Sequence, residues 1–307
     1  MDIKKLFYKL TNKKKYVNYK INEGKKKNIS ILNSGFEKEI IKIQEAIQKK
    51  VEVSFLHSGH LGDVINALPV IKELSKTHKC NFYLQANKSL PKHAVRYKHA
   101  NDYIYMSDRM VKMILPLLKH QNYIEKVEKY NGQKIDIDLD LFRKMPMNFN
   151  LDEVRWYFQL TGIHADLSIP YLNVEPSEEI KNKIVIMRST RKKNIFINYA
   201  FLKDYKNILF IGLKDEYEDL KKEVPNLEFH DCKDFLEAAE IIQASRFFIG
   251  NSSFGFTIAE ALKVPRLAES FPQFPVIYPN GGEGYEFYFQ IHFEKLFKHL
   301  NSLKNSY

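Results

Sequence analysis

The feature that most constrains the fold is an alternation of strand and helix patterns that occurs twice along the 307-residue chain. In the first half, short apolar runs alternate with amphipathic helical spacing. Strands are expected there at residues 51–56, 81–85 and 134–141, and helices at residues 63–76, 107–130 and 151–162. In the second half, strands are expected at residues 183–187, 208–211, 227–230 and 247–249, and helices at residues 216–223, 235–244 and 255–262. Because successive β-α units build parallel sheets, the sequence predicts an α/β protein with two Rossmann-like, doubly wound domains.

The domain boundaries are predicted from composition. Residues 168–182 contain Pro170 and Pro176 and have the composition of a linker. Ser34 and Glu37 have the spacing of a capping box, so a helix is expected to begin there. We therefore predict an N-terminal arm (1–33), a first domain (34–175) and a second domain (176–307).

Most of the net charge lies in the arm. Residues 1–30 contain ten lysines and two acidic residues, which is +8 of the chain's +11. Ile3, Leu6, Phe7 and Leu10 share one helical face, a pattern typical of basic helices that lie on an anionic bilayer. The alternative is a solvated tail that packs these residues on the body. The body carries 38 basic and 35 acidic residues, so nucleic acid is not predicted as a partner.

Cysteine content and hydropathy predict the compartment. Cys80 and Cys232 are the only cysteines, so no disulfide framework can form and a reducing environment is expected. Lysines interrupt the N-terminal apolar residues, which argues against a secretory signal, and no run approaches the roughly 18 apolar residues of a membrane span. The chain is predicted to be cytoplasmic. The arm would allow it to attach peripherally to the inner face of the membrane.

The first candidate loop follows the strand at residues 51–56. Two glycines there permit close backbone approach, and Asp63 stands where the next helix is expected to begin. Asp63 is either a helix N-cap or a general base, since a helix N-terminus favours the ionised carboxylate. The residues predicted to line the cleft around it are His57, Ser58, Gly59, His60 and Gly62.

Two loops of the second half have the composition of anion sites. Cations and hydroxyls follow the strand at 183–187, where arginine can bind a diphosphate bidentately, although a solvated basic loop is the alternative. Small and hydroxyl residues follow the strand at 247–249, where free N–H groups at a helix N-terminus favour a phosphate. The predicted donor-binding residues of these loops are Arg188, Ser189, Arg191, Lys192, Asn251, Ser252, Ser253 and Gly255.

No metal site is predicted. Asp136, Asp138 and Asp140 form an Asp-x-Asp series, but they alternate with apolar residues, and that alternation is typical of a half-buried strand. We found no zinc-ligand spacing, nucleophile elbow or complete dinucleotide fingerprint. No cofactor is expected either, because a nucleotide-sugar would enter as a substrate.

The block GDVINALPVIKEL at residues 62–74 closely resembles the N-terminal motif of glycosyltransferase family nine, the heptosyltransferase-like enzymes. The resemblance extends in patches over residues 50–270. It implies a GT-B fold, in which two Rossmann-like domains face each other across a cleft. It also implies that the first domain binds the acceptor, that the second binds the nucleotide-sugar donor, and that Asp63 is the catalytic base. In many such enzymes the last helix crosses back to the first domain, and residues 293–303 could do so here.

The C-terminal half departs from family nine, which usually has Asp-(Ser/Thr)-Gly followed by histidine in the third loop. Residues 250–253 (GNSS) instead resemble UDP-N-acetylglucosamine 2-epimerases. Residues 254–265 (FGFTIAEALKVP) resemble the nucleotide-sugar block of other GT-B enzymes, in which the position of Glu260 binds the ribose. These departures argue against ADP-heptose as the donor.

Together these features predict an inverting, metal-independent glycosyltransferase. Its partners would be a nucleotide-sugar donor and a glycan or lipid-linked acceptor, in surface glycan or lipopolysaccharide synthesis. The alternatives are a nucleotide-sugar epimerase or hydrolase on the same fold, and a non-catalytic protein whose arm binds membrane or nucleic acid.

Overall fold

The computed structural model describes residues 2–91, 103–146, 152–273 and 277–303. Its two sheets are wholly parallel, as the sequence predicts. The first has the order β3-β2-β1-β4 and the second the order β10-β9-β8-β5-β6-β7. The strands of the first sheet are β1 (Glu52–His57), β2 (Lys79–Leu84), β3 (Lys126–Lys129) and β4 (Ile137–Asp138). Those of the second are β5 (Ile184–Met187), β6 (Ile208–Ile211), β7 (Glu228–His230), β8 (Phe247–Asn251), β9 (Arg266–Glu269) and β10 (Gly284–Phe287).

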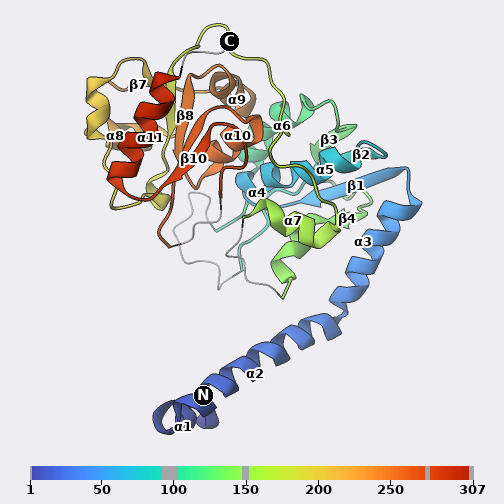
Figure 1. The fold of residues 1–307 in the computed structure, drawn as a ribbon. Coiled ribbons are helices and arrows are strands. Elements are labelled where there is room, and N and C mark those ends of the chain that lie inside the picture. The colour runs from blue at the N-terminus through green and yellow to red at the C-terminus, as the bar shows by residue number, and fades with distance from the viewer. Residues whose placement is uncertain (1, 92–102, 147–151, 274–276, 304–307) are drawn as a thin grey trace.

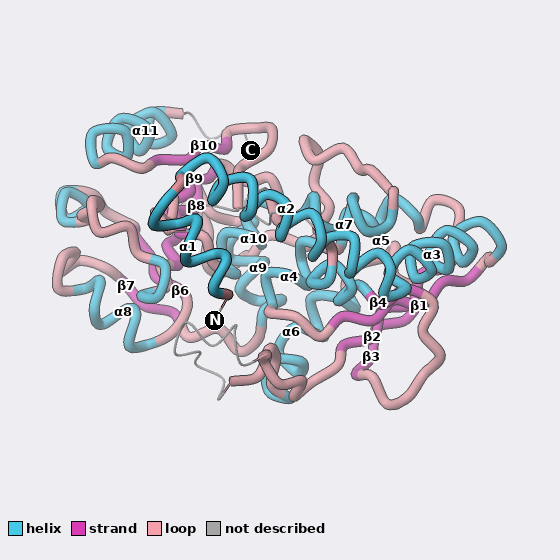
Figure 2. The backbone as a smooth tube through the Cα atoms, turned by 90° about the horizontal axis from the view of Figure 1, so that it is seen from below, coloured by secondary structure: helices cyan, strands magenta, loops and turns pink. Residues whose placement is uncertain are grey.

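Helices lie between the two sheets and around them. The helices of the first half are α1 (Ile3–Thr11), α2 (Lys13–Ile31), α3 (Glu37–Lys49), α4 (Leu61–Asn66), α5 (Leu68–Leu74), α6 (Asp108–Lys119) and α7 (Val154–Thr161). Those of the second half are α8 (Lys214–Lys221), α9 (Phe235–Gln243), α10 (Phe254–Leu262) and α11 (Gln290–Ser302). Figure 2 shows β1–β4 and β5–β10 on opposite sides, with α4, α9 and α10 in the middle.

The two halves share a buried interior. Helix α10 packs against α4, and α9 packs against α6. Every residue of α10 from Gly255 to Leu262 is buried, and one apolar cluster runs from Val53 in β1 to Val185 in β5. Burial of each large apolar side chain contributes about 1.5–3 kcal/mol, so this interior fixes α4 and α10 against each other. The domain boundary at residue 175 stays a prediction.

The expectation for the last helix is not met. Helix α11 buries Phe293, Phe297 and Leu300. The ring of Phe293 stacks on Phe287 of β10, and Phe297 contacts Phe247 of β8. Because the apolar face of α11 matches the aromatic residues of its own sheet, the helix packs on the second sheet and does not cross back.

Three predicted elements are wrong in extent. The helix predicted at residues 107–130 ends at Lys119, and strand β3 follows within the same range. The strand predicted at 134–141 is shorter in the structure and corresponds to β4. It ends there because a 3-10 turn, Leu139–Lys144, follows, and Asp138 caps that turn by accepting a hydrogen bond from the Asp140 backbone N–H. The helix predicted at 63–76 divides at Ala67 into α4 and α5.

The arm is helical and projects away from the body (Figure 1). The capping box predicted at Ser34 does not form, because a π-helical turn, Leu32–Phe36, continues the chain from α2 to α3 with a kink at Gly35 (φ 96°). The Ser34 hydroxyl donates to the carbonyl of Ile31. Phe36 is the first buried residue of the described chain. Of the described residues, no helix has both the length and the apolar character that crossing a membrane requires.

Candidate functional site

Asp63 lies in the first turn of α4, after the loop that leaves β1. It is not the N-cap of that helix, a position held by His60. Its Oδ2 accepts a hydrogen bond of 2.9 Å from Nη2 of Arg143, and 13% of its side chain is exposed. Within the described residues, no hydrogen bond reaches Oδ1. One carboxylate oxygen is therefore held by an ion pair, and the other can accept a proton.

Arg143, which the sequence analysis missed, holds this arrangement in place. It reaches Asp63 from the 3-10 turn, forms a second ion pair with Asp140, and lies with its guanidinium 4.4 Å from the centre of the Tyr105 ring. A Cβ at Gly59 would lie 2.3 Å from Nη2 of Arg143 and 2.6 Å from Oδ2 of Asp63. A side chain at residue 59 would therefore displace the Arg143–Asp63 ion pair from its present position.

His57 and Ser58 are buried beneath the pair. The His57 ring is fully buried, with Nε2 2.8 Å from the Tyr157 hydroxyl and Nδ1 accepting the Gly59 backbone N–H at 2.8 Å. Burial lowers the pKa of His57 to about 4, so the ring is neutral at physiological pH. Ser58 bonds to the carboxylate of Asp140. Both side chains are therefore buried and hydrogen-bonded within the protein, and their predicted place in the cleft loop stays a prediction.

His60 is the more accessible histidine of this loop. It is half-buried, and its Nδ1 lies 3.1 Å from the carbonyl oxygen of Tyr105. Burial lowers the pKa of His60, and the positive charge of Arg191, from the second half of the chain, acts in the same direction. The first two predicted loops therefore lie close enough to interact electrostatically.

Arg188, which is predicted to bind the donor, forms a buried ion pair within the second half of the chain. Its Nε and Nη2 lie 2.7 and 3.0 Å from the two carboxylate oxygens of Glu269, and its guanidinium stacks 4.3 Å from the Tyr199 ring centre. Only 3% of the Arg188 side chain and 0% of the Glu269 side chain are exposed. A buried guanidinium needs a carboxylate partner, so Arg188 is a structural residue of the second sheet.

Ser189 and Asn251 join the ends of β5 and β8. The Asn251 side chain accepts the Ser189 backbone N–H at 3.1 Å and donates to the Ser189 carbonyl at 2.7 Å. Both residues are buried. Their predicted contact with a donor stays a prediction. Of the other cations of this loop, Arg191 is exposed and Lys192 is half-buried.

The predicted anion loop has one unsatisfied hydroxyl. Ser253 occupies the N-cap position of α10, but its side chain makes no capping bond, and its buried Oγ finds no hydrogen-bond partner among the described residues. Ser252 beside it is buried. At Gly255 a Cβ would lie 2.3 Å from Sδ of Met187, so glycine lets α10 start close against β5.

Glu260 lies near the C-terminal end of α10. Its carboxylate accepts from Nε of Arg266 at 2.6 Å and from the Asn280 backbone N–H at 3.1 Å, and it pairs with Lys263. It is 5% exposed. The ribose contact that the family resemblance implies is therefore not available in this arrangement, since Glu260 holds the loop before β10.

Contacts between the halves bring the first and third loops together. An ideal Cβ on Gly62 would lie 3.6 Å from Cγ2 of Thr257 in α10, which is ordinary van der Waals contact. The start of α4, which carries Asp63, thus meets the start of α10. The carboxyl ends of β1, β5 and β8 therefore contribute to one region, as expected for ligand sites of open α/β sheets.

Glu153 is a second carboxyl of this region that the sequence did not indicate. It precedes α7, is 8% exposed, and accepts a 3.0 Å hydrogen bond from Nδ2 of Asn66. Burial raises the pKa of Glu153 to about 8, helped by the negative charge of Asp63 and opposed by Lys192. Perturbed carboxyls of this kind are common in functional sites. The only sequence signal was its position at the start of the predicted helix at 151–162.

A hollow of about 320 Å³ lies elsewhere, between the linker and the ends of α6 and α9. Its lining includes His120, Asn173 and Gln243. None of the candidate site residues borders it, so it is separate from the region around Asp63.

Two parallel sheets joined through an α4–α10 contact define a GT-B architecture, the class that the sequence predicts. The structure is similar to a glycosyltransferase family 9 protein from Veillonella parvula (TM-score 0.52, 14% identity, 83% of this chain and 90% of that chain covered). It is also similar to the E. coli heptosyltransferase WaaC with ADP-2-deoxy-2-fluoro heptose (TM-score 0.54, 11% identity, 82% and 100% covered). UDP-GlcNAc 2-epimerase from Neisseria meningitidis matches more weakly (TM-score 0.37, 12% identity, 83% and 95% covered).

No protein-family model and no curated protein matches the sequence. The structural likenesses confirm the fold that the motif at residues 62–74 implied.

Proposed function

We propose that this chain is an inverting, metal-independent glycosyltransferase that moves a sugar from a nucleotide-sugar donor to a hydroxyl acceptor in surface glycan or lipopolysaccharide synthesis. One observation carries the proposal. Asp63 has one oxygen held by Arg143, and its loop packs against the N-terminus of α10, where the buried Ser253 hydroxyl has no partner in the described part of the chain. A fixed base and an anion site then face the same region.

In this mechanism Oδ1 of Asp63 takes the proton of the acceptor hydroxyl. The acceptor oxygen forms a bond to the anomeric carbon as the bond from that carbon to the diphosphate oxygen breaks, and the nucleoside diphosphate leaves with the electron pair. A single displacement inverts the anomeric configuration. A positioned base of this kind contributes roughly 10²–10⁴-fold to the rate.

The leaving diphosphate would meet the start of α10. The Ser253 hydroxyl and the free N–H groups there are donors, and the positive end of the helix dipole favours an anion. Arg191 and Lys192 supply positive charge from the neighbouring loop. Arg188 takes no part, because Glu269 already neutralises it.

The first test is a thermal-shift screen against UDP, GDP, ADP, CMP and their common sugar conjugates. A ligand at a hundred times its dissociation constant stabilises the folded state by about 2.7 kcal/mol, which is readily measured. Stabilisation by one nucleotide class supports the donor site. No stabilisation by any of them contradicts the proposal and favours a non-catalytic body. Conversion of the sugar without an acceptor would indicate an epimerase.

The second test uses the nucleotide-sugar that the screen identifies. Asp63→Asn should lower release of nucleoside diphosphate at least a hundredfold while leaving donor affinity unchanged, because the amide cannot take the proton. Asp215→Asn, at an exposed aspartate of α8, is the matched control and should keep full activity. Equal rates for Asp63→Asn and the wild type would remove Asp63 as the base.

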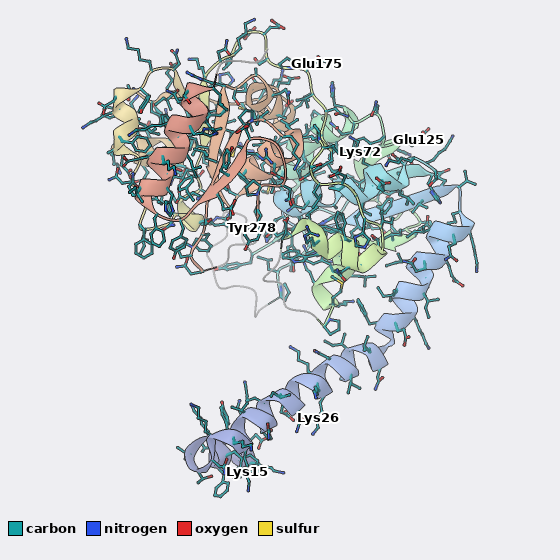
Figure 3. All side chains as sticks on the ribbon, viewed as in Figure 1. Lys15, Lys26, Lys72, Glu125, Glu175 and Tyr278 are labelled. Atoms are coloured by element: carbon teal, nitrogen blue, oxygen red, sulfur yellow. The ribbon has the colours of Figure 1, made fainter. Side chains whose placement is uncertain are left out.

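We further propose that the arm binds an anionic membrane surface and brings the enzyme to a lipid-linked acceptor. In α1, Ile3, Phe7 and Leu10 are 82%, 59% and 77% exposed, so their apolar face is not packed on the body. Lysines surround this face, and Figure 3 shows Lys15 and Lys26 on the arm, well away from the body. Apolar burial and charge attraction together support interfacial binding.

Co-sedimentation with vesicles tests the arm. Vesicles with 30% phosphatidylserine should bind the full chain, and binding should fall with added salt. A triple serine variant at Ile3, Phe7 and Leu10 keeps every lysine, so loss of binding in that variant supports insertion of the apolar face. Unchanged binding after deletion of residues 1–30 would exclude the arm.

A further inference from the structure

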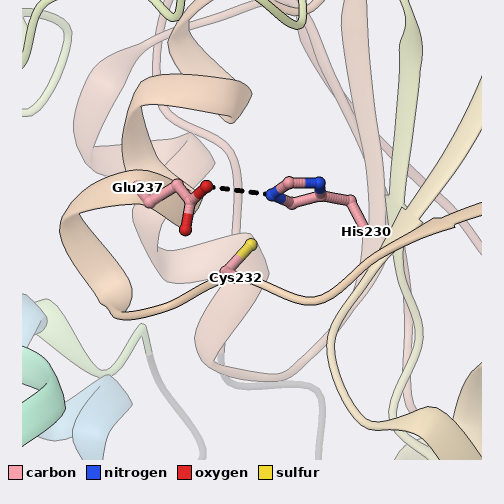
Figure 4. A group of neighbouring side chains, drawn as sticks. All are labelled: His230, Cys232 and Glu237. Carbon is pink, nitrogen blue, oxygen red and sulfur yellow. Dashed lines mark hydrogen bonds and ion pairs between the residues drawn. The ribbon is translucent and has the colours of Figure 1, made fainter.

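A cluster of three potential metal ligands lies at the carboxyl end of β7, outside the region around Asp63. His230 ends the strand, Cys232 follows in the loop, and Glu237 lies in the first turn of α9. Their nearest ligand atoms lie within 4.8 Å of one another, and Nε2 of His230 is 2.9 Å from Oε1 of Glu237 (Figure 4). All three side chains are half-buried.

The local fold holds these residues together. Asp234 caps α9 by accepting the backbone N–H groups of Leu236 and Glu237 at 2.9 and 3.0 Å. The cap turns the helix so that the Glu237 carboxylate points back to the loop, where Oε2 accepts the Lys233 backbone N–H at 2.6 Å. The two oxygens of Glu237 thus bond to the loop backbone and to His230, with the thiol of Cys232 beside them.

We propose that His230, Cys232 and Glu237 bind one divalent transition-metal ion of the zinc class. Zinc bonds of about 2.0–2.3 Å to nitrogen, oxygen and sulfur place tetrahedral ligand atoms about 3.3–3.8 Å apart. In the cluster one pair of ligand atoms is 2.9 Å apart and all of them lie within 4.8 Å of one another, so small side-chain rotations suffice to bind an ion. An imidazole and a thiolate favour zinc over magnesium or calcium, which prefer oxygen ligands.

The surrounding charge also suits a cation. Asp231 and Asp234 lie close enough to act electrostatically on the Cys232 thiol, in addition to Glu237. Three protein ligands leave a fourth position for water or an outside ligand. The spacing His-x-Cys-x4-Glu matches no common zinc motif, so the sequence alone did not indicate this site.

The ion would lie outside the sugar-transfer chemistry but near the donor loop. The Phe235 ring, in the same segment as the ligands, packs edge-on against Phe254 with ring centres 4.5 Å apart. Phe254 directly follows Ser253, the N-cap residue of α10. A bound ion would therefore fix the position of a segment that supports the anion site, with no part in bond making.

Titration of the metal-free full chain with Co²⁺ tests the site, because cobalt bound to a thiolate absorbs in the near ultraviolet and tetrahedral cobalt absorbs in the visible. We expect one Co²⁺ per chain, displaced by Zn²⁺. Cys232→Ser should remove the thiolate band and weaken binding at least tenfold. Cys80→Ala is the matched control, since Cys80 is buried in the first half of the chain, and it should keep the full spectrum.

Glu237→Gln distinguishes the loss of a metal ligand from the loss of the local fold. Its amide oxygen can still accept the Lys233 backbone N–H and its amide N–H can donate to Nε2 of a neutral His230, so the fold should persist while metal affinity falls at least tenfold. Zn²⁺ should raise the melting temperature of the wild type and have no such effect on Cys232→Ser. Absence of a thiolate band in the wild type, or its persistence in Cys232→Ser, would overturn the proposal, whatever the outcome of the nucleotide screen.

Discussion

The substitution Glu153→Gln tests whether the buried Glu153 carboxyl keeps its proton in the folded chain. In the folded chain the pKa of Glu153 is raised from 4.5 to about 8, chiefly by burial. The folded state therefore holds a proton that the unfolded chain loses above pH 4.5. Stability from this group is complete below pH 4.5 and declines as the pH rises towards 8. Glutamine keeps an oxygen to accept from Asn66 and has no proton to lose.

The magnitude follows from the shift. At about 1.4 kcal/mol per pKa unit, the wild type should lose about 2–3 kcal/mol relative to Glu153→Gln between pH 5 and pH 7, and more by pH 8. Urea denaturation of both proteins at pH 5, 6, 7 and 8 measures the difference directly, because other titrating groups are common to both. A difference that stays constant across this range would refute a raised pKa at Glu153.

Two further substitutions test the geometry around the site. Arg188→Met should lower the free energy of unfolding, measured by urea denaturation, by about 3–5 kcal/mol, because Glu269 would remain as a buried charge without its partner. Donor affinity of the folded variant, measured by calorimetry, should stay within twofold of the wild type. A tenfold loss of affinity would show that Arg188 binds the diphosphate. Gly59→Ala should lower the free energy of unfolding by about 1–3 kcal/mol and slow nucleoside diphosphate release, since a Cβ collides with the Arg143–Asp63 pair. An alanine variant as active and as stable as the wild type would show that the pair is not held as described.

Local patterns in the sequence determined the order and type of most elements. The strand at 208–211 was predicted to the residue, and the strands at β1, β5 and β8 were predicted within two residues. Periodicity succeeds there because these strands are buried runs between clear turns. It fails at β3, a four-residue edge strand whose burial alternates only weakly, and at β9 and β10, which lie between the helices predicted at 255–262 and 293–303.

The sequence also indicated the candidate loops, because ligand sites of α/β folds lie at the carboxyl ends of strands. The motif at residues 62–74 singled out Asp63 and implied the GT-B fold, which the structure confirms. The role of Asp63 as a base stays a prediction.

Only the tertiary structure decided which polar side chains are available to a ligand. Arg143 is 80 residues from Asp63, and Arg188 is 81 residues from Glu269. Such pairings depend on which chain segments the packed sheets bring together, and no local pattern encodes them. Of two loops predicted to bind an anion, one therefore contains a buried ion pair at Arg188, and the other contains a Ser253 hydroxyl without a hydrogen-bond partner among the described residues. The difference arises because burial forces each charge to find a partner, and the fold alone determines which partners lie within reach.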